Sequence, residues 1–243
     1  MAKLILVRHG ESTWNKENRF TGWTDVPLTK RGKKQAQQGG AALTAANIPI
    51  HSIFTSYLTR AKQTLTEMHL ATPATVTSAW QLNERHYGAL QGLNKQETAQ
   101  THGEEQVLLW RRSYDVPPPA LSDDDDRHPR NDPLYEHVQP ELLPATECLK
   151  DTVMRAWPYY KEYIKPLLQE GNNVLIVAHG NSLRALIKQL ETISDEDILA
   201  VNVPYAIPIV YDIKQDVVEK KEFLADEQTL KKLEEEVKNQ GKA

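Results

Sequence analysis

The stretch KLILVRHGES, residues 3–12, decides how this chain begins to fold. Its apolar run LILV shows no alternation with polar residues, which is typical of a β-strand covered on both faces. The chain then changes at once to Arg8, His9 and Gly10. A histidine at a strand end is often a hydrogen-bonded core residue, whereas a glycine beside it suits a sharp turn or the close approach of a ligand. The stretch therefore predicts a buried strand and leaves the role of its histidine open.

A second apolar run ends in the same way. NVLIVAHG, residues 173–180, places His179 and a glycine directly after a buried strand, and residues 181–190 continue with a helical stripe of leucine and isoleucine. Ligands of open α/β sheets bind in the crevice beyond the carboxyl ends of the strands. Two strand-end histidines in one chain therefore favour a shared functional site.

The other elements alternate between helices and strands, which predicts a mostly parallel sheet flanked by helices. Gly39 and Gly40 weaken the helix predicted at 30–46, and Pro158 is expected to kink or interrupt the helix predicted at 147–169. No internal repeat or linker is found, so residues 1–243 are predicted to form a single domain. Helices are predicted at 30–46, 57–68, 104–115 and 147–169, and further strands at 52–56, 74–80, 206–213 and 217–224.

Two segments break this pattern. Residues 117–144 contain seven of the 14 prolines and a run of four aspartates, Asp123–Asp126. A loop of this length is usually a functional lid or a disordered segment. We favour a solvated loop over a metal site, because consecutive acidic residues rarely converge on one ion. Residues 225–243 form a highly charged tail, for which we expect a loosely docked helix and a mobile, frayed end.

Composition narrows the class of protein. The net charge of −4 argues against a nucleic-acid or anionic-membrane partner, and no apolar run is long enough for a membrane span or a signal peptide. Cys148 is the single cysteine, so an intrachain disulfide is impossible, which fits a reducing, cytoplasmic location. No residue spacing typical of a metal site is present.

The two histidines, together with Arg8 and with Arg60 after the strand at 52–56, would gather positive charge in one cleft. An acidic protein with such a cleft is suited to a dianion such as phosphate. A neutral imidazole is nucleophilic near pH 7 and forms covalent intermediates. We therefore predict that one histidine attacks phosphorus while the other, protonated, stabilises the transition state without a metal.

Beyond these inferences, the chain closely resembles the cofactor-dependent phosphoglycerate mutases of the histidine phosphatase superfamily. The bare Arg-His-Gly triplet is weakly specific, but the matching motifs extend over nearly the whole chain. They include LVRHGESTWN at 6–15, TSYLTRAKQTL at 55–65, LNERHYGALQGLNKQET at 82–98, GEEQVLLWRRSYDVPPP at 103–119 and VLIVAHGNSLRAL at 174–186.

The resemblance implies a role for each matching position. His9 corresponds to the nucleophile that becomes phosphohistidine, and Glu84 to the general acid/base. The expected cradle of the transferred phosphoryl group is Arg8, Asn15, Arg60, His179 and the backbone of Gly180 and Asn181. The rest of the substrate is expected on Tyr87, Lys95, Arg111 and Arg112, with Ser12, Thr21 and Gly22 on the first loop. Without the resemblance, surface charge is the favoured explanation of two adjacent arginines on a helix, because successive side chains point about 100° apart.

The resemblance also implies a phosphoglycerate mutase-like three-layer α/β sandwich. It implies interconversion of 3-phosphoglycerate and 2-phosphoglycerate in glycolysis and gluconeogenesis, with 2,3-bisphosphoglycerate as primer and intermediate, no metal, and a homodimer or homotetramer. Minor synthase and phosphatase activities are expected, and the loop at 117–144 and the tail are expected to act as lids. The alternatives are a phosphatase or bisphosphoglycerate synthase of the same superfamily, and a non-catalytic phospholigand-binding protein.

One departure from the family pattern lies near the C-terminus. The family usually has Thr-Gly where this chain has Tyr205 and Ala206, in NVPYAIPIVY. If that glycine adopts a positive φ, Ala206 is expected either to be strained or to change the turn.

Overall fold

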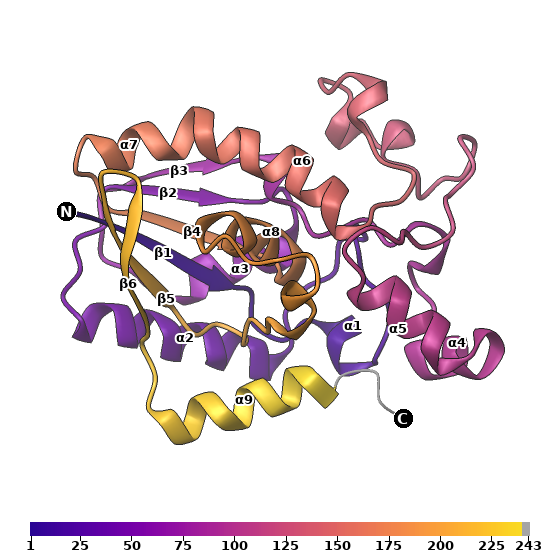
Figure 1. Cartoon of the computed structure of the whole chain (residues 1–243), viewed down its shortest axis with the longest axis horizontal. Helices are drawn as coiled ribbons and strands as arrows, with labels where there is room; N and C mark the ends of the chain where they lie inside the picture. Colours follow the sequence, from indigo (N-terminus) through magenta and orange to yellow (C-terminus); the bar gives the residue numbers. More distant parts are fainter. Residues whose placement is uncertain (240–243) are drawn as a thin grey trace.

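A six-stranded sheet forms the centre of the fold (Figure 1). The structure is a computed structural model that describes residues 1–239. The strand order is β3-β2-β4-β1-β5-β6, so the first strand of the chain lies inside the sheet. The strands are β1 (Ala2–Arg8), β2 (Ser52–Thr55), β3 (Thr75–Ser78), β4 (Val174–Ala178), β5 (Ile209–Lys214) and β6 (Val217–Phe223).

The predicted mostly parallel sheet is confirmed in its four-strand half. Strands β3, β2, β4 and β1 pair in parallel, whereas β5 runs antiparallel to both β1 and β6. The strands predicted at 206–213 and 217–224 thus close the sheet as an antiparallel pair. The parallel half points the carboxyl ends of β1, β2 and β4 to one edge, where the site described below lies.

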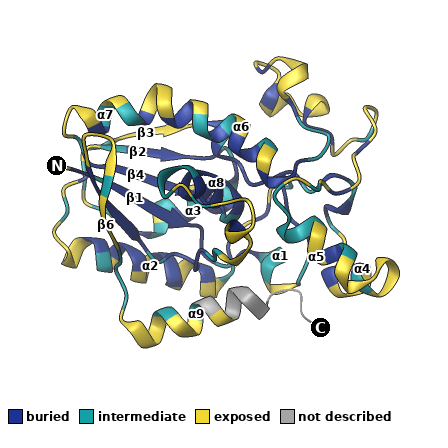
Figure 2. Cartoon of the chain, in the orientation of Figure 1, coloured by how far each residue is buried: buried dark blue, intermediate teal, exposed yellow. Residues whose placement is uncertain are grey.

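Helices cover both faces of the sheet and make three layers (Figures 1 and 2). Along β1, Leu4 and Leu6 pack on one face and Ile5 and Val7 on the other, and all four are fully buried. Burial on both faces explains the strand's lack of alternation. The first face contacts α6 (Leu149–Tyr159), α7 (Lys165–Gln169) and α8 (Gly180–Leu190); the second contacts α2 (Lys30–Ala45) and α3 (Thr59–Glu67).

The rest of the chain gathers beyond the carboxyl ends of the strands (Figure 1). It comprises α1 (Thr13–Lys16), α4 (Lys95–His102), α5 (Glu104–Arg112) and the long loop at 117–144. The loop contains three short 3₁₀ turns, and its Tyr135 packs on Trp23 in a small cluster of its own. Asp123 pairs with Arg130 and Asp125 with Arg127, each at 2.7 Å, so these two acids contact the loop's own arginines.

The helix predicted at 147–169 is interrupted close to Pro158, as expected. Helix α6 contains this proline one residue before its end, and a π-helical turn at Tyr160–Ile164 then leads into α7. Met154, four residues before Pro158, is 67% exposed, so the carbonyl that loses its donor lies on the face toward water. Pro166 stands in the first turn after the π-helical segment, which is a position where the missing N–H costs least. The two prolines therefore flank the change of helix type.

The paired glycines of α2 are explained by close packing. A Cβ on Gly39 would lie 2.2 Å from the carbonyl oxygen of Ala206, and one on Gly40 would lie 2.0 Å from that of Met68. Both obstacles are backbone atoms, which cannot rotate away. The glycines weaken the helix locally and allow it to contact two other segments.

We expect Gly39→Ala to destabilise the protein by about 2 kcal/mol, because overpacking outweighs the usual helix preference for alanine. Helix propensity alone predicts the opposite sign, a gain of about 1 kcal/mol. The midpoint and slope of urea unfolding measure the difference. Gln38→Ala, an exposed neighbour on the same helix, is the matched control and should change stability by less than about 0.5 kcal/mol. A stabilised Gly39→Ala variant would show that the close contact is absent.

Ala206 adopts the strained backbone that the sequence indicated, with φ of +54°. An alanine in the left-handed region costs about 1–2 kcal/mol. The turn is therefore retained without a glycine, and its strain is balanced by the packing of a residue that is only 1% exposed.

The charged tail begins as a helix, α9 (Glu227–Asn239), in agreement with its leucine spacing. The end of the predicted mobile tail, residues 240–243, lies outside the described residues. Within residues 1–239, no helix is both long and apolar enough to cross a bilayer.

Candidate active site

The two strand-end histidines meet, as the sequence predicted. Strands β1 and β4 are parallel neighbours in which Arg8 is opposite Ala178, so the next residues, His9 and His179, leave the sheet side by side. Their ring centroids are 5.0 Å apart, and the backbone N–H of His9 donates to the backbone carbonyl of Ala178 at 2.9 Å. The register of two buried strands thus fixes the centre of the site.

His9 is oriented as a nucleophile. Its Nδ1 lies 2.7 Å from the carbonyl oxygen of Gly10, which can only accept a hydrogen bond, so Nδ1 carries the proton of the neutral ring. The other nitrogen, Nε2, then holds the free lone pair. Burial, with the charges of Arg60 and Arg8, lowers the pKa of His9 well below its ordinary value. The ring is therefore a neutral base near pH 7.

His179 begins α8 and lies behind His9, fully buried and 2.7 Å from the Ser56 hydroxyl through Nε2. Burial, then Arg60 and His9, lower the pKa of His179 well below its ordinary value. The desolvation and the surrounding arginines both oppose a second cation in the ligand-free site, so the expectation that this histidine is protonated during phosphoryl transfer stays a prediction.

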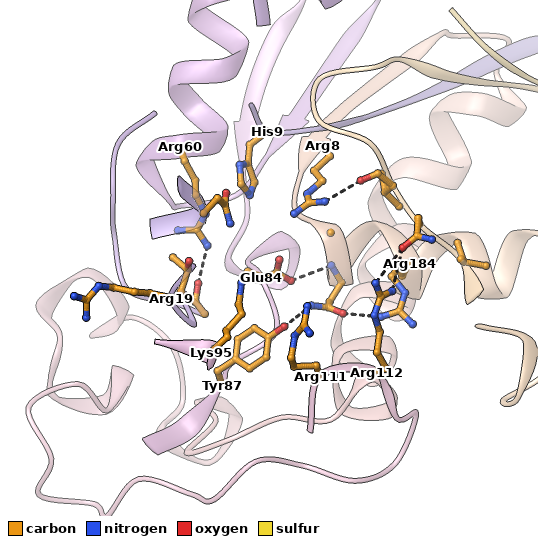
Figure 3. A pocket seen from close by; sticks show the side chains of 18 residues that line it. Arg8, His9, Arg19, Arg60, Glu84, Tyr87, Lys95, Arg111, Arg112 and Arg184 are labelled. Carbon is orange, nitrogen blue, oxygen red and sulfur yellow. Dashed lines mark hydrogen bonds between the residues drawn. The ribbon is translucent and has the colours of Figure 1, made fainter. Parts of the chain in front are cut away.

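A strongly cationic cavity opens in front of His9 (Figure 3). Seven arginine or lysine side chains line it together with one carboxylate, Glu84, although the whole chain is acidic. Such a concentration of one charge in a partly enclosed space attracts a polyanion. The complete lining is Arg8, His9, Asn15, Arg19, Thr21, Gly22, Arg60, Glu84, Tyr87, Lys95, Arg111, Arg112, Gly180, Asn181, Arg184, Val201, Asn202 and Val203.

Arg60 connects the first loop to the sheet side of the cavity. It lies in the first turn of α3, is 1% exposed, and donates to the carbonyl oxygens of Gly22 at 2.7 Å and Thr24 at 3.0 Å. Burial lowers the pKa of Arg60 to about 10, so the guanidinium remains charged near pH 7. Arg60 therefore positions the first loop and also supplies a cation beside His9.

The Glu84 carboxylate is held in place by backbone hydrogen bonds, one of them from the start of α8. Its Oε1 accepts the backbone N–H groups of Arg85 at 2.8 Å and Asn181 at 3.0 Å. The side chain is 8% exposed and lines the cavity. One carboxylate thus faces the cavity and is held by two backbone hydrogen bonds, as a general acid/base requires.

A second group of cations faces the cavity from α4 and α5. Lys95 begins α4, and Arg111 and Arg112 form the last turn of α5. Both arginines line the cavity although they are adjacent in sequence, and Arg112 donates twice to Asn202 Oδ1 at 3.1 Å. Burial and the charge of Arg111 lower the pKa of Lys95 to about 7. The ligand-free site is therefore strained by its own positive charge.

Two of the predicted residues lie elsewhere than expected. Ser12 does not line the cavity; it caps α1, where its hydroxyl accepts the Asn15 N–H and donates to the Asn15 side chain. His179 also lies behind the lining, against His9. None of residues 117–144 lines the cavity, so the lid role of this loop remains a prediction.

Sequence reasoning missed several lining residues, namely Arg19, Arg184, Val201, Asn202 and Val203. Arg184 is 5% exposed and donates to Asn181 Oδ1 at 2.9 Å, which orients that amide in the cavity. Arg184 falls inside the motif quoted at 174–186, so its motif membership was a usable signal, whereas Arg19 lies four residues beyond the motif quoted at 6–15. The segment at 201–203 carries no comparable signal, because its approach to the site depends on the tertiary fold.

Comparison with known proteins agrees with this geometry. The family model of the histidine phosphatase superfamily (branch 1) matches residues 4–141 and 121–223. A curated relative from Hydrogenobaculum sp. (strain Y04AAS1), named 2,3-bisphosphoglycerate-dependent phosphoglycerate mutase, is 50% identical over 250 residues that cover 100% of both chains.

Solved structures share the fold at lower identity. The α-ribazole phosphatase of Shigella flexneri has a TM-score of 0.68 at 22% identity, covering 92% of this chain and 96% of that chain. A mycobacterial glucosyl-3-phosphoglycerate phosphatase in complex with VO3 has a TM-score of 0.67 at 22% identity, covering 87% and 93%. The family model spans most of the chain and the relative is half identical along all of it, so this protein belongs to the histidine phosphatase superfamily.

Proposed function

We propose that the chain is a 2,3-bisphosphoglycerate-dependent phosphoglycerate mutase, which interconverts 3-phosphoglycerate and 2-phosphoglycerate through a phosphohistidine at His9. The observation that carries this proposal is the neutral His9, with Nε2 free, at the end of a cavity that has a separate second group of cations. A simple phosphatase needs only the first group. The relative that is 50% identical along the whole chain has the same activity in its name.

The residues divide the work between two anionic ends of the substrate. Arg8, Asn15, Arg60 and the start of α8 at Gly180 and Asn181 bind the phosphoryl group that is transferred, with His179 behind it. Lys95, Arg111, Arg112 and Tyr87 bind the carboxylate and the phosphate that remains, and Thr21 and Gly22 line the first loop. Two separate anion sites allow a bisphosphate to bind in either orientation.

The chemistry requires one nucleophile and one acid/base. 2,3-Bisphosphoglycerate supplies the phosphoryl group that first loads His9. Phosphohistidine then gives this group to the free hydroxyl of 3-phosphoglycerate; the N–P bond breaks, an O–P bond forms, and Glu84 takes the hydroxyl proton. In the reverse orientation, His9 Nε2 attacks the other phosphorus and Glu84 returns the proton to the leaving oxygen. 2-Phosphoglycerate is released and His9 is phosphorylated again.

The bound dianion also changes the charge balance around His179. The cations that lower the pKa of His179 in the ligand-free site are the same groups that would be neutralised by a phosphoryl group. An N–H of His179 can then donate to the developing charge on phosphorus. The transition state, rather than the empty site, is the state in which a positive His179 is favourable.

Coupled turnover of 3-phosphoglycerate, with and without a trace of 2,3-bisphosphoglycerate, tests the proposed function. We expect turnover without added metal that depends on the bisphosphate primer. Phosphate release measured in parallel should be a minor side reaction, since water competes poorly for phosphohistidine in a filled site. Release of phosphate with no isomerisation would instead identify the chain as a phosphatase of the same superfamily.

Lys95 gives a prediction for pH. Its pKa of about 7 in the ligand-free site means that it is mostly neutral at pH 8, and a bound anion should restore its charge. Binding of 3-phosphoglycerate at pH 8 should therefore take up nearly one proton, and affinity should fall up to about tenfold for each pH unit above 7.

Calorimetric titration in two buffers with different ionisation enthalpies measures that proton. Lys95→Arg retains the charge at all pH values and is the matched control, in which the uptake should disappear. Equal binding heats in both buffers for the unaltered protein would contradict the prediction.

A further inference from the structure

The segment that departs from the family pattern, Tyr205 and Ala206, contacts Arg8 through its backbone. The backbone of Tyr205 forms a parallel bridge with Arg8, and the Ala206 N–H donates to the Arg8 carbonyl at 2.9 Å. The Arg8 side chain in turn donates from Nη1 to the Val203 carbonyl at 2.9 Å. Residues 203–206 therefore contact both the backbone and the side chain of this arginine.

The Tyr205 ring completes the contact. The Cζ of Arg8 lies 4.0 Å from the ring centroid, which is a cation–π arrangement, and the ring lies 6.1 Å from that of His9. Tyr205 is only 3% exposed and does not line the cavity. Arg8 does line it, and its guanidinium lies on the His9 side of the cavity (Figure 3). Any effect of Tyr205 on a ligand must therefore pass through the arginine.

Arg8 requires such support. It is 8% exposed, and its Nε is buried without a hydrogen-bond partner among the described residues. Other cations surround the same cavity and repel it. A ring face attracts a guanidinium most where water is excluded, by about 0.5–2 kcal/mol. The ring also restricts the orientation of the planar guanidinium, whose N–H groups donate within its own plane.

We propose that Tyr205 is a positioning residue of the phosphoryl-transfer site, whose ring face holds the Arg8 guanidinium in its phosphate-binding orientation. The threonine usual at this position in the family cannot provide a ring, so this chain orients its arginine by different means. The positive φ of Ala206 lies directly after this ring, at the residue whose N–H donates to the Arg8 carbonyl. The inference rests on the proposed phosphoryl transfer at His9.

The test compares Tyr205→Phe, which keeps the ring, with Tyr205→Leu, which keeps apolar bulk without a π face. Orthovanadate is the probe, since it mimics a phosphoryl group in transfer and binds tightly to sites built for that state. We expect Tyr205→Phe to remain within about twofold of the unaltered protein. Tyr205→Leu should weaken vanadate inhibition and lower kcat/KM by about 3- to 30-fold.

A merely structural role would not follow the electronics of the ring. Phenylalanines of increasing fluorine content at position 205 should weaken vanadate in graded steps, because fluorine withdraws charge from the ring face while its bulk changes little. This series also replaces the leucine variant should that variant fail to fold. Thermal unfolding measured in parallel separates stability from binding.

Two results would overturn the inference. Unchanged vanadate inhibition in Tyr205→Leu or across the fluorinated series would leave the ring without a role in binding. A loss in Tyr205→Phe as large as that in Tyr205→Leu would assign the effect to the hydroxyl. Failure of the proposed function is distinguishable, since the unaltered protein would then show no primer-dependent isomerisation, whereas the role of the ring is read from vanadate inhibition of the variants.

Discussion

Replacing His9 by glutamine should lower mutase turnover by about 10⁴-fold or more, because the reaction then has no covalent route. Glutamine gives up the Nδ1 hydrogen bond to the Gly10 carbonyl, but it is uncharged and approximates the length of the histidine side chain. The fold and the cationic cavity should therefore remain. The primer-coupled assay measures the loss, and incubation with labelled 2,3-bisphosphoglycerate should leave no acid-labile phosphate on the variant.

His102→Gln provides the control, since this exposed histidine ends α4 and does not line the cavity. It should retain full turnover and full labelling. If His9→Gln kept more than about 1% of turnover, another group would be the phosphoryl acceptor, and the orientation of the His9 ring would need a different explanation.

Glu84→Gln should lower turnover by about 10²- to 10⁴-fold, the range expected for loss of a general acid/base. The substitution keeps a carbonyl oxygen that can accept the N–H groups of Arg85 and Asn181, so the start of α8 should stay in place. The variant loses only the ability to take and return a proton. Glu97→Gln, an exposed carboxylate on α4, is the control and should have no effect.

An activated phosphate ester separates proton transfer from phosphoryl transfer in this variant. p-Nitrophenyl phosphate has a leaving group that departs without protonation, so Glu84→Gln should still form phosphohistidine from it within about tenfold of the normal rate. If loading from this ester fell as far as turnover of 3-phosphoglycerate, Glu84 would act in binding or folding rather than as the acid/base.

The sequence was most informative where burial leaves few choices. The apolar runs before His9 and His179 predicted two central strands, and parallel pairing then brought the two histidines together at one edge. Periodicity could not give the antiparallel direction of β5, because strand direction depends on where the connecting segments pass. Pro158 marked the place of the irregularity in the long helix but not its form, since the chain continues through a π-helical turn.

The site was predicted unevenly for physical reasons. Residues inside the motifs that the chain shares with the family could be assigned one by one. The side-chain direction of Ser12 depends on local hydrogen bonds, and the charge state of His179 depends on its burial and on the surrounding charges. Asn202 and Val203 were missed because they reach the cavity only through the path of the segment before β5. A sequence pattern carries no record of that path.

The place of β1 in the sheet has a consequence for how the protein is made. Leu4 pairs with Val174 on one side and with Tyr211 on the other, so the first strand to leave the ribosome finds its last neighbour about 200 residues later. Until β4 is made, both edges of this strand stay open to other chains, and the edge that β5 covers stays open longest. The nucleophile is thus synthesised among the first residues, and the strand that carries it is completed among the last. During synthesis this N-terminal strand is a natural target for a chaperone.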